Sequence, residues 1–181
     1  QIGLAIRMYV DDNDGWYLQA WYPNYGWNTY LIYKGYLKNE NIFRCPSFKG
    51  DWKGYNTHYS YNYAHIATSY RMLYPISGWD RPAKEGEIRQ PHRTILLVEG
   101  KRYGTVPECG CYLMFDSYTA SSSYANPDPR HNKFGEKGTF HVLFCDGHVD
   151  PITVPRAQDA YTTSYLGSYN TPGKLGQWKR Y

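Results

Sequence analysis

The segment from Thr139 to Val149 constrains the fold of this chain most, because its pattern predicts a β-hairpin. Its centre is Asp146-Gly147, a dipeptide favoured in two-residue type I′ turns, where both central residues need a positive φ. Alternation with a period of two places one group of side chains on an apolar face: Phe140, Val142, Phe144 and Val149. It places another group on the opposite face, with the last two facing each other across the turn: His141, Cys145 and His148.

The polar face of this hairpin raises the question of a metal site or an active site. His141, Cys145 and His148 are candidate zinc ligands, but no Cys-x-x-Cys or His-Glu-x-x-His pattern accompanies them. The chain also lacks a Gly-x-Ser-x-Gly motif, a P-loop and a Rossmann fingerprint. Glu99, at the end of an apolar run, is the only acid in a suggestive place. We therefore expect no catalytic residue, no metal and no cofactor.

An amphipathic helix is predicted at the start of the chain. Apolar residues follow helical spacing, with the last at Val10: Ile2, Ala5, Ile6, Tyr9 and Val10. The helix should stop in the run Asp11-Asp-Asn-Asp-Gly15, since short polar side chains compete for the backbone and glycine permits the turn. The same run does not match an EF-hand loop, because with Gly15 at loop position 6 the first ligand position is occupied by Val10. A helix stop is favoured over a calcium site.

Three segments read as strands. His58 to Tyr63 alternates, Thr94 to Glu99 is continuous and β-branched, and Cys111 to Phe115 is a third apolar run. Together with the hairpin they predict a loop-rich α+β domain over residues 1–154. In it, the N-terminal helix packs on an antiparallel sheet of about four or five strands, the last of which form the C-terminal hairpin. Residues 155–181 form an aromatic Gly/Ser/Thr-rich tail that we expect to pack on this domain or on a neighbouring subunit.

Aromatic residues are concentrated between positions 16 and 36, where a second helix is predicted from Trp27 to Leu37. Two interpretations are open: the rings pack this helix onto the first helix and the sheet, or they form an exposed platform for glycan stacking or subunit contacts. The residues in question are Trp16, Tyr17, Trp21, Tyr22, Tyr25 and Trp27. We expect Trp16, Trp21 and Trp27 to contribute to an at least partly exposed cluster.

Composition excludes some classes of function. The chain has 181 residues, 21 of them Tyr, and a net charge of +4 with scattered Lys and Arg, which does not support nucleic-acid binding. In an oxidising compartment its four cysteines, Cys45, Cys109, Cys111 and Cys145, allow three pairings. Cys109 and Cys111 are poorly placed to bridge each other. A disulfide from one of them to Cys45 or Cys145 is expected, and reduced thiols are the alternative.

Several short motifs recur in the order found in one known family. They are Gln1 to Gly15, Gly35-Tyr36-Leu37, Ile42 to Ser47, Ser60-Tyr-Asn62, Thr94 to Glu99, Arg130-His131-Asn132 and the hairpin. Taken together they resemble the prepilin-type proteins with a C-terminal H-X9-DG domain that are numerous in the Planctomycetes and Lentisphaerae. The signature residues would be His131, Asp146 and Gly147, although here fourteen residues lie between His131 and Asp146.

The resemblance implies a structural subunit of a pseudopilus or pilus-like filament associated with type II secretion. An upstream hydrophobic helix, absent from this sequence, would anchor the protein in the membrane and form the filament core. This domain would be the outer shell, exported to the cell envelope or surface, with copies of itself and other pseudopilins as partners. The alternative is a surface-displayed module that binds polysaccharide or a partner through its Trp and Tyr residues, and a distant third is a metal-dependent hydrolase.

Overall fold

The computed structural model describes residues 1–52, 54–63, 65–67, 81–102, 109–111, 113–114, 124–162, 165–168, 171–174 and 176. The helices are α1 (Ile2–Asp12) and α2 (Trp27–Tyr33), and the 3-10 helices are η1 (Glu40–Phe43), η2 (Gly54–Asn56), η3 (Glu85–Glu87) and η4 (Ala157–Tyr161). The strands are β1 (Trp21–Tyr22), β2 (Tyr25–Gly26), β3 (Tyr59–Asn62), β4 (Ile95–Lys101), β5 (Leu113–Met114), β6 (Asn126–Pro127), β7 (His131–Phe134), β8 (Lys137–Phe144), β9 (Val149–Val154), β10 (Gly167–Ser168) and β11 (Thr171–Pro172).

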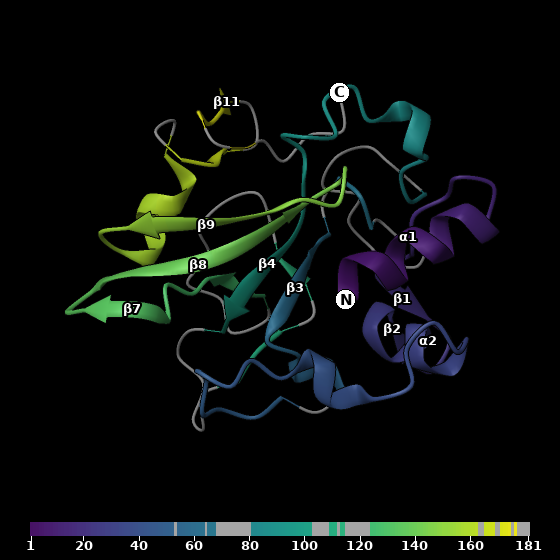
Figure 1. Ribbon diagram of the computed structural model, residues 1–181, viewed down its shortest axis with the longest axis horizontal. Coiled ribbons are helices and arrows are strands. Elements are labelled where there is room, and N and C mark those ends of the chain that lie inside the picture. The colour runs from purple at the N-terminus through teal and green to yellow at the C-terminus, as the bar shows by residue number, and fades with distance from the viewer. Residues whose placement is uncertain are drawn as a thin grey trace.

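The main sheet has seven strands and is mixed, so the fold is α+β as expected but the predicted antiparallel sheet of four or five strands is only partly right (Figure 1). Its central path is β5-β3-β4-β8-β7, with β6 paired to β4 and β9 paired to β8. All these pairs are antiparallel except β3 with β5. Strand β4 runs opposite to β3 and the chain reverses again before β5, so β5 reaches the outer edge of β3 in the same direction as β3.

The N-terminal helix has the predicted apolar stripe and the predicted end. The buried residues of α1 are Ile2, Ala5, Ile6, Tyr9 and Val10. After the helix, Asp14 and Gly15 both have positive φ, and the Gly15 N–H donates to the carbonyl oxygen of Val10 at 2.9 Å. This turn pairs one of the carbonyls in the last turn of the helix, as short polar residues and glycine favour. The prediction of a helix stop is therefore confirmed.

Two apolar cores lie on the two faces of the sheet. One holds the buried sides of α1 and α2 against residues such as Tyr61, Leu97 and Leu143, and Figure 1 shows both helices together beside the sheet. The other is formed by alternate residues of β8 and β9, with Ala160 and Leu166 from the C-terminal segment packed onto it. The predicted strands over 58–63 and 94–99 are β3 and β4. Tyr112 and Phe115 of the third predicted strand lie outside the described residues, as do 163–164, 169–170, 175 and 177–181 of the tail.

The C-terminal hairpin is present, but its turn differs from the prediction. Gly147 has a positive φ and Asp146 does not, and the Gly147 N–H donates to the Phe144 carbonyl oxygen at 3.0 Å. The Phe144 N–H in turn donates to the carbonyl oxygen of His148, which makes a three-residue loop ending in a left-handed glycine rather than a type I′ turn. The extra residue pairs Leu143 with Val149. Val149 therefore leaves the apolar face and is exposed, contrary to the prediction.

No helix among the described residues combines the length and the apolar character that crossing a bilayer requires.

The burial of Trp27 gives a first prediction. Its side chain is fully buried against Phe43 and Tyr61, with ring centroids at 5.6 and 5.2 Å. Trp27→Ala should lower the free energy of unfolding by roughly 3–5 kcal/mol, because it leaves a large cavity between α2 and the sheet. Trp16→Ala is the matched control and should have a much smaller effect, since Trp16 is only half-buried. Urea denaturation followed by circular dichroism measures both, and equal losses would contradict this assignment of the core.

Candidate functional site

The candidate site is centred on the carboxylate of Glu99, a buried residue on β4. Its Oε1 lies 2.8 Å from Nε2 of His131 and accepts the Cys45 thiol at 3.6 Å. Its Oε2 accepts the backbone N–H of His141 at 2.8 Å and lies 3.0 Å from Nδ1 of the same ring. Cys45 Sγ and His131 Nε2 are themselves 3.7 Å apart. We call Cys45, Glu99, His131 and His141 the Glu99 cluster.

Glu99 reaches this position because the sheet divides beside it. Strand β4 pairs with β8 as far as Val98 opposite Val142, and then pairs with β6 from Gly100 onward. The next residue of β8, His141, therefore has no β4 carbonyl opposite its N–H. The Glu99 carboxylate takes that hydrogen bond instead, and a buried amide would otherwise be left unpaired. The division of the sheet thus fixes the direction of the Glu99 side chain.

Cys45 is held by its backbone rather than by its side chain. It follows η1, and its N–H donates to Nδ1 of the buried His58 ring at 2.8 Å. The His58 N–H donates in turn to the carbonyl oxygen of Phe43 at 3.1 Å. These two bonds fasten the end of η1 to the start of β3. The start of β3 is also next to Glu99, because Tyr59 of β3 pairs with Glu99 of β4. The thiol of Cys45 therefore lies beside the Glu99 carboxylate.

His131 is positioned by the segment that precedes β7. The Asp128 N–H donates to the Glu99 carbonyl oxygen at 2.9 Å, so this segment is tied to the backbone of the central acid. Arg130 forms a buried ion pair with Asp128 at 3.0 Å and donates through Nη2 to the Gly100 carbonyl oxygen at 2.7 Å. Its guanidinium also lies over the ring of Phe48. These contacts fix the backbone just before His131, so that the His131 ring reaches the Glu99 carboxylate.

The surroundings favour an ionised Glu99 and a protonated Cys45 thiol. Burial pushes the pKa of Glu99 upward, but hydrogen bonds from His131 and the His141 N–H, together with the charge of Arg130, outweigh burial and bring the pKa below its ordinary value. Burial raises the pKa of the Cys45 thiol. Burial and then the charge of Arg130 lower the pKa of His58 to about 4, so the neutral ring can accept the Cys45 N–H.

The geometry does not suit a nucleophilic cysteine. In a Cys-His-acid triad, the thiol and the acid bind opposite nitrogens of the imidazole, so that the ring can take the thiol proton. Here Cys45 and Glu99 both contact Nε2 of His131. A raised thiol pKa also disfavours the reactive thiolate. Among the described residues, Cys45, Glu99 and His131 are instead the group whose ligand atoms lie close enough together to hold a metal ion.

The residues of the H-X9-DG signature do not meet. His131 belongs to the Glu99 cluster and pairs with Thr139 near the start of β8, whereas Asp146 and Gly147 lie beyond the other end of β8. At about 3.3 Å per residue along a strand, the two ends are on the order of 20 Å apart. Asp146 instead accepts the ring and the N–H of His148, at 2.6 and 3.2 Å.

The three metal candidates of the hairpin are also separated. His141 joins the Glu99 cluster, whereas Cys145 is buried in the core, where its carbonyl oxygen accepts the Tyr17 hydroxyl at 3.3 Å. His148 stacks on Phe144, with ring centroids 4.4 Å apart. The prediction that Cys145 and His148 face each other across the turn is wrong, because the three-residue loop brings His148 over the neighbouring side chain.

The aromatic residues divide between the core and the surface. Tyr17 and Trp27 are buried, so the expectation that Trp27 belongs to an exposed cluster is wrong. Trp16 and Trp21 are half-buried, and the Trp16 ring lies under the cationic groups of Arg81 and Lys84. Tyr22 stacks on Tyr30 at 3.5 Å and Tyr25 stacks on Tyr33 at 4.6 Å. Tyr22 of β1 and Tyr25 of β2 thus form a row of stacked tyrosines with Tyr30 and Tyr33 of α2, which we call the tyrosine row.

The four cysteines are all buried, and Cys45 and Cys145 are thiols. The expected disulfide from one of these two to Cys109 or Cys111 is therefore not formed in the structure. Cys45 lies in the Glu99 cluster and Cys145 in the core beside Tyr17, so each thiol is enclosed by other contacts.

Sequence reasoning noticed Glu99 but not its partners. The signal was an acid at the end of a continuous apolar strand, where burial without partners is unfavourable. The partners lie 54 and 32 residues away, at Cys45 and His131. Both belong to short motifs on which the family resemblance rests, Ile42 to Ser47 and Arg130 to Asn132, so those motifs could have suggested the cluster.

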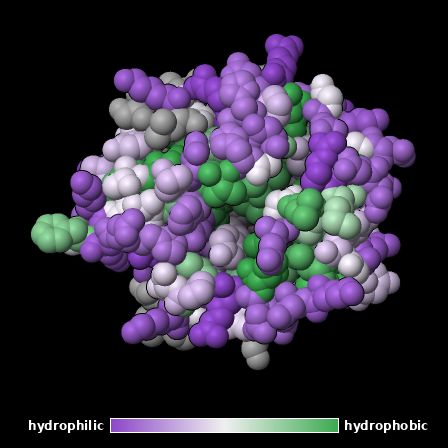
Figure 2. Space-filling view, in the orientation of Figure 1, coloured by the Kyte–Doolittle hydropathy of each residue, from purple (hydrophilic) through white to green (hydrophobic). Residues whose placement is uncertain are grey.

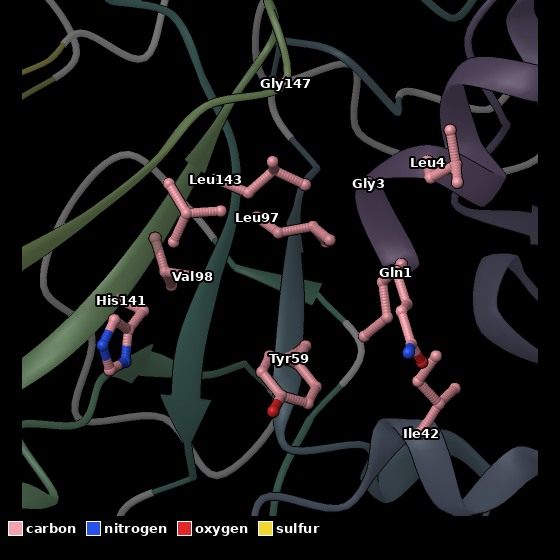
Figure 3. Close-up of a pocket in the computed structure, with 12 residues that line it drawn as sticks. Gln1, Gly3, Leu4, Ile42, Tyr59, Leu97, Val98, His141, Leu143 and Gly147 are labelled. Carbon is pink, nitrogen blue, oxygen red and sulfur yellow. The ribbon is translucent and has the colours of Figure 1, made fainter.

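A cavity of about 490 Å³ adjoins the cluster between the N-terminal end of α1 and the sheet. Figure 3 shows His141, Tyr59, Leu97 and Leu143 on the sheet side and Gln1 and Leu4 on the helix side. Figure 2 shows a hollow in this face of the molecule with apolar side chains gathered around it. The lining of the cavity is mostly aliphatic. His141 belongs both to this lining and to the Glu99 cluster, and it therefore connects the two.

Comparison of the chain with protein-family models, with curated proteins and with solved structures finds no match.

The buried ion pair beside the cluster gives a second prediction. Asp128→Asn should destabilise the fold by about 3–5 kcal/mol, because it leaves the buried Arg130 guanidinium without its counter-charge. The control is Asp11→Asn, which breaks the exposed pair with Arg7 on α1 and should change stability by only about 0.3–0.5 kcal/mol. Chemical denaturation of both variants provides the measurement. A small effect of Asp128→Asn would mean that water reaches Arg130.

Proposed function

We propose that this domain is the outer, globular part of a pilin-like subunit of a secretion-associated filament at the cell surface, and that it is not an enzyme. The ordered set of prepilin-type motifs is the basis of this proposal, and a helix packed across a largely antiparallel sheet agrees with it. The partners would be further copies of the chain and other pseudopilins, and a hydrophobic helix upstream of this sequence would provide the membrane anchor.

The observation that carries the proposal is the outer side of α1. While one stripe of the helix is buried against the sheet, Leu4 and Met8 are 66% and 48% exposed one turn apart. Two large apolar side chains at i and i+4 form a continuous surface on a helix. An apolar strip of this kind on the N-terminal helix suits packing against the helices of neighbouring subunits.

We therefore expect Leu4→Glu combined with Met8→Glu to abolish filaments in cells that make the complete protein. Both side chains are exposed, although Leu4 also lines the cavity beside α1, so the thermal stability of the purified domain should fall only slightly. Electron microscopy and immunoblotting of the sheared surface fraction measure assembly. Phe134→Glu is the matched control, since Phe134 is 87% exposed at the far end of the β7–β8 hairpin. This variant should form filaments normally. Normal filaments from the double variant would refute the role of this strip.

The tyrosine row formed by β1, β2 and α2 favours a second function, the binding of polysaccharide. Tyr33 is 62% exposed, stacks on Tyr25 and has the Lys34 ammonium 5.8 Å from its ring centroid. Its accessible ring and the nearby cation could pack on the C–H face of a sugar and bind its hydroxyls. Most other rings of the row are occupied by contacts with each other, so the proposed surface is confined to Tyr25 and Tyr33.

If this second function is correct, Tyr33→Ala should weaken polysaccharide retention about two- to tenfold, as expected for the loss of one aromatic stack. Affinity electrophoresis of the domain through gels that contain soluble cell-wall polysaccharides provides the measurement. Phe134→Ala, which removes an exposed ring elsewhere, should leave retention unchanged. Absence of retention for the unmodified protein would leave filament assembly as the only proposed role.

A further inference from the structure

We propose that Cys45, Glu99 and His131 bind a zinc ion, with His141 as the fourth ligand. The site is distinct from the filament contacts on α1 and does not depend on them. Three of the four ligands come from segments that are distant in the sequence, and their donor atoms already converge on one point. Cys45 and Glu99 are buried, which distinguishes the site from the acidic clusters that are common on protein surfaces.

The distances fit tetrahedral zinc with a small adjustment. Zinc bonds of about 2.3 Å to sulfur and about 2.0–2.1 Å to nitrogen and oxygen place a sulfur about 3.5–3.6 Å from the other ligand atoms. The thiol of Cys45 lies 3.6 Å from Glu99 Oε1 and 3.7 Å from His131 Nε2. Oε1 and Nε2 are hydrogen-bonded at 2.8 Å and would separate by roughly half an ångström when the metal replaces the shared proton.

The donor set selects zinc over the harder cations. Calcium and magnesium take oxygen ligands almost exclusively, whereas a thiolate, an imidazole and a carboxylate together suit zinc. Binding would displace the thiol proton of Cys45 to solvent and move the N–H of His131 from Nε2 to Nδ1. The thiolate and the Glu99 carboxylate would then carry two negative charges against the two positive charges of the ion, so the buried site would be neutral overall.

We assign His141 as the fourth ligand because it adjoins two of the other three, Glu99 and His131. Its ring centroid is 5.0 Å from that of His131, and its Nδ1 is 3.0 Å from Glu99 Oε2. The ring is partly exposed and lines the adjoining cavity, so it has room to turn a nitrogen toward the ion. Closing the site with a fourth protein ligand is typical of structural rather than catalytic zinc.

The contacts around the cluster resemble the outer shell of a metal site. The Cys45 backbone is fixed by His58, and the Glu99 backbone is fixed by Asp128. Such contacts orient ligands before the metal arrives. A zinc ion here would join the end of η1, β4 and β7, and would cross-link the chain where the sequence had suggested a disulfide.

The test is the metal content of the complete protein, purified without chelators and without a polyhistidine tag. Plasma mass spectrometry should find about one zinc per chain, as expected for a single closed site. Cys45→Ser and His131→Asn should lose it, and His141→Ala should bind zinc more weakly, because the site would keep three of its four protein ligands. Cys145→Ser and His148→Asn are the matched controls and should keep their zinc.

A spectroscopic test distinguishes the loss of a zinc ligand from the loss of the fold. Cobalt(II) added to the apo protein should give a thiolate-to-cobalt charge-transfer band in the near ultraviolet and the intense visible bands of a tetrahedral ion. The charge-transfer band should disappear in Cys45→Ser and persist in Cys145→Ser, with circular dichroism confirming that both are folded. Absence of zinc from the unmodified protein together with no cobalt band would overturn the proposal, as would a band that Cys45→Ser retains.

Discussion

The arrangement of the sheet depends on the hydrogen bonds that the Glu99 carboxylate accepts, above all the one from the His141 N–H. Where β4 turns from β8 toward β6, the N–H of His141 loses the carbonyl that a continuous ladder would offer, and the Glu99 side chain accepts that N–H instead. The same carboxylate draws in His131 and Cys45. One acid therefore compensates for the division of the sheet and gathers three other segments. A buried charge is tolerated here because each of its oxygens has two donors.

The polar network around Glu99 begins where the apolar part of β4, which contributes to both cores, ends. On one face α1 and α2 cover Leu97 and Leu143, and on the other the C-terminal segment covers Phe140 and Ile152. The network includes the buried ion pair between Arg130 and Asp128. In surroundings of low polarity, such hydrogen bonds and ion pairs are strong when complete and costly when one member is missing. The network thus specifies one arrangement of β4, β7 and β8.

Local patterns predicted local structure, and failures arose where distant segments meet. The stripe of α1, the stop at Gly15 and the buried strand β4 follow from periodicity and from residues that act within one or two turns. The hairpin was also predicted, but its turn type depends on whether Cys145 is taken into the core, which the sequence does not reveal. The expectation that Trp27 is partly exposed was also wrong, because its burial depends on contacts with Phe43 and Tyr61 from other segments. The Glu99 cluster contains a contact between residues 86 positions apart, Cys45 and His131, and only the path of the sheet brings them together.

If the proposed H-X9-DG signature is present in this chain, the structure accommodates its longer spacing. The two halves of the signature occupy different places, since His131 contacts Glu99 whereas Asp146 and Gly147 close the β8–β9 turn. The added residues, 133–138, extend the β7–β8 hairpin, where Phe134 pairs with Lys137 and is almost fully exposed. Because β8 fixes the position of both halves, growth of this hairpin into solvent moves neither. The spacing can therefore vary, while loss of His131 would remove one of the donors to the buried Glu99 carboxylate.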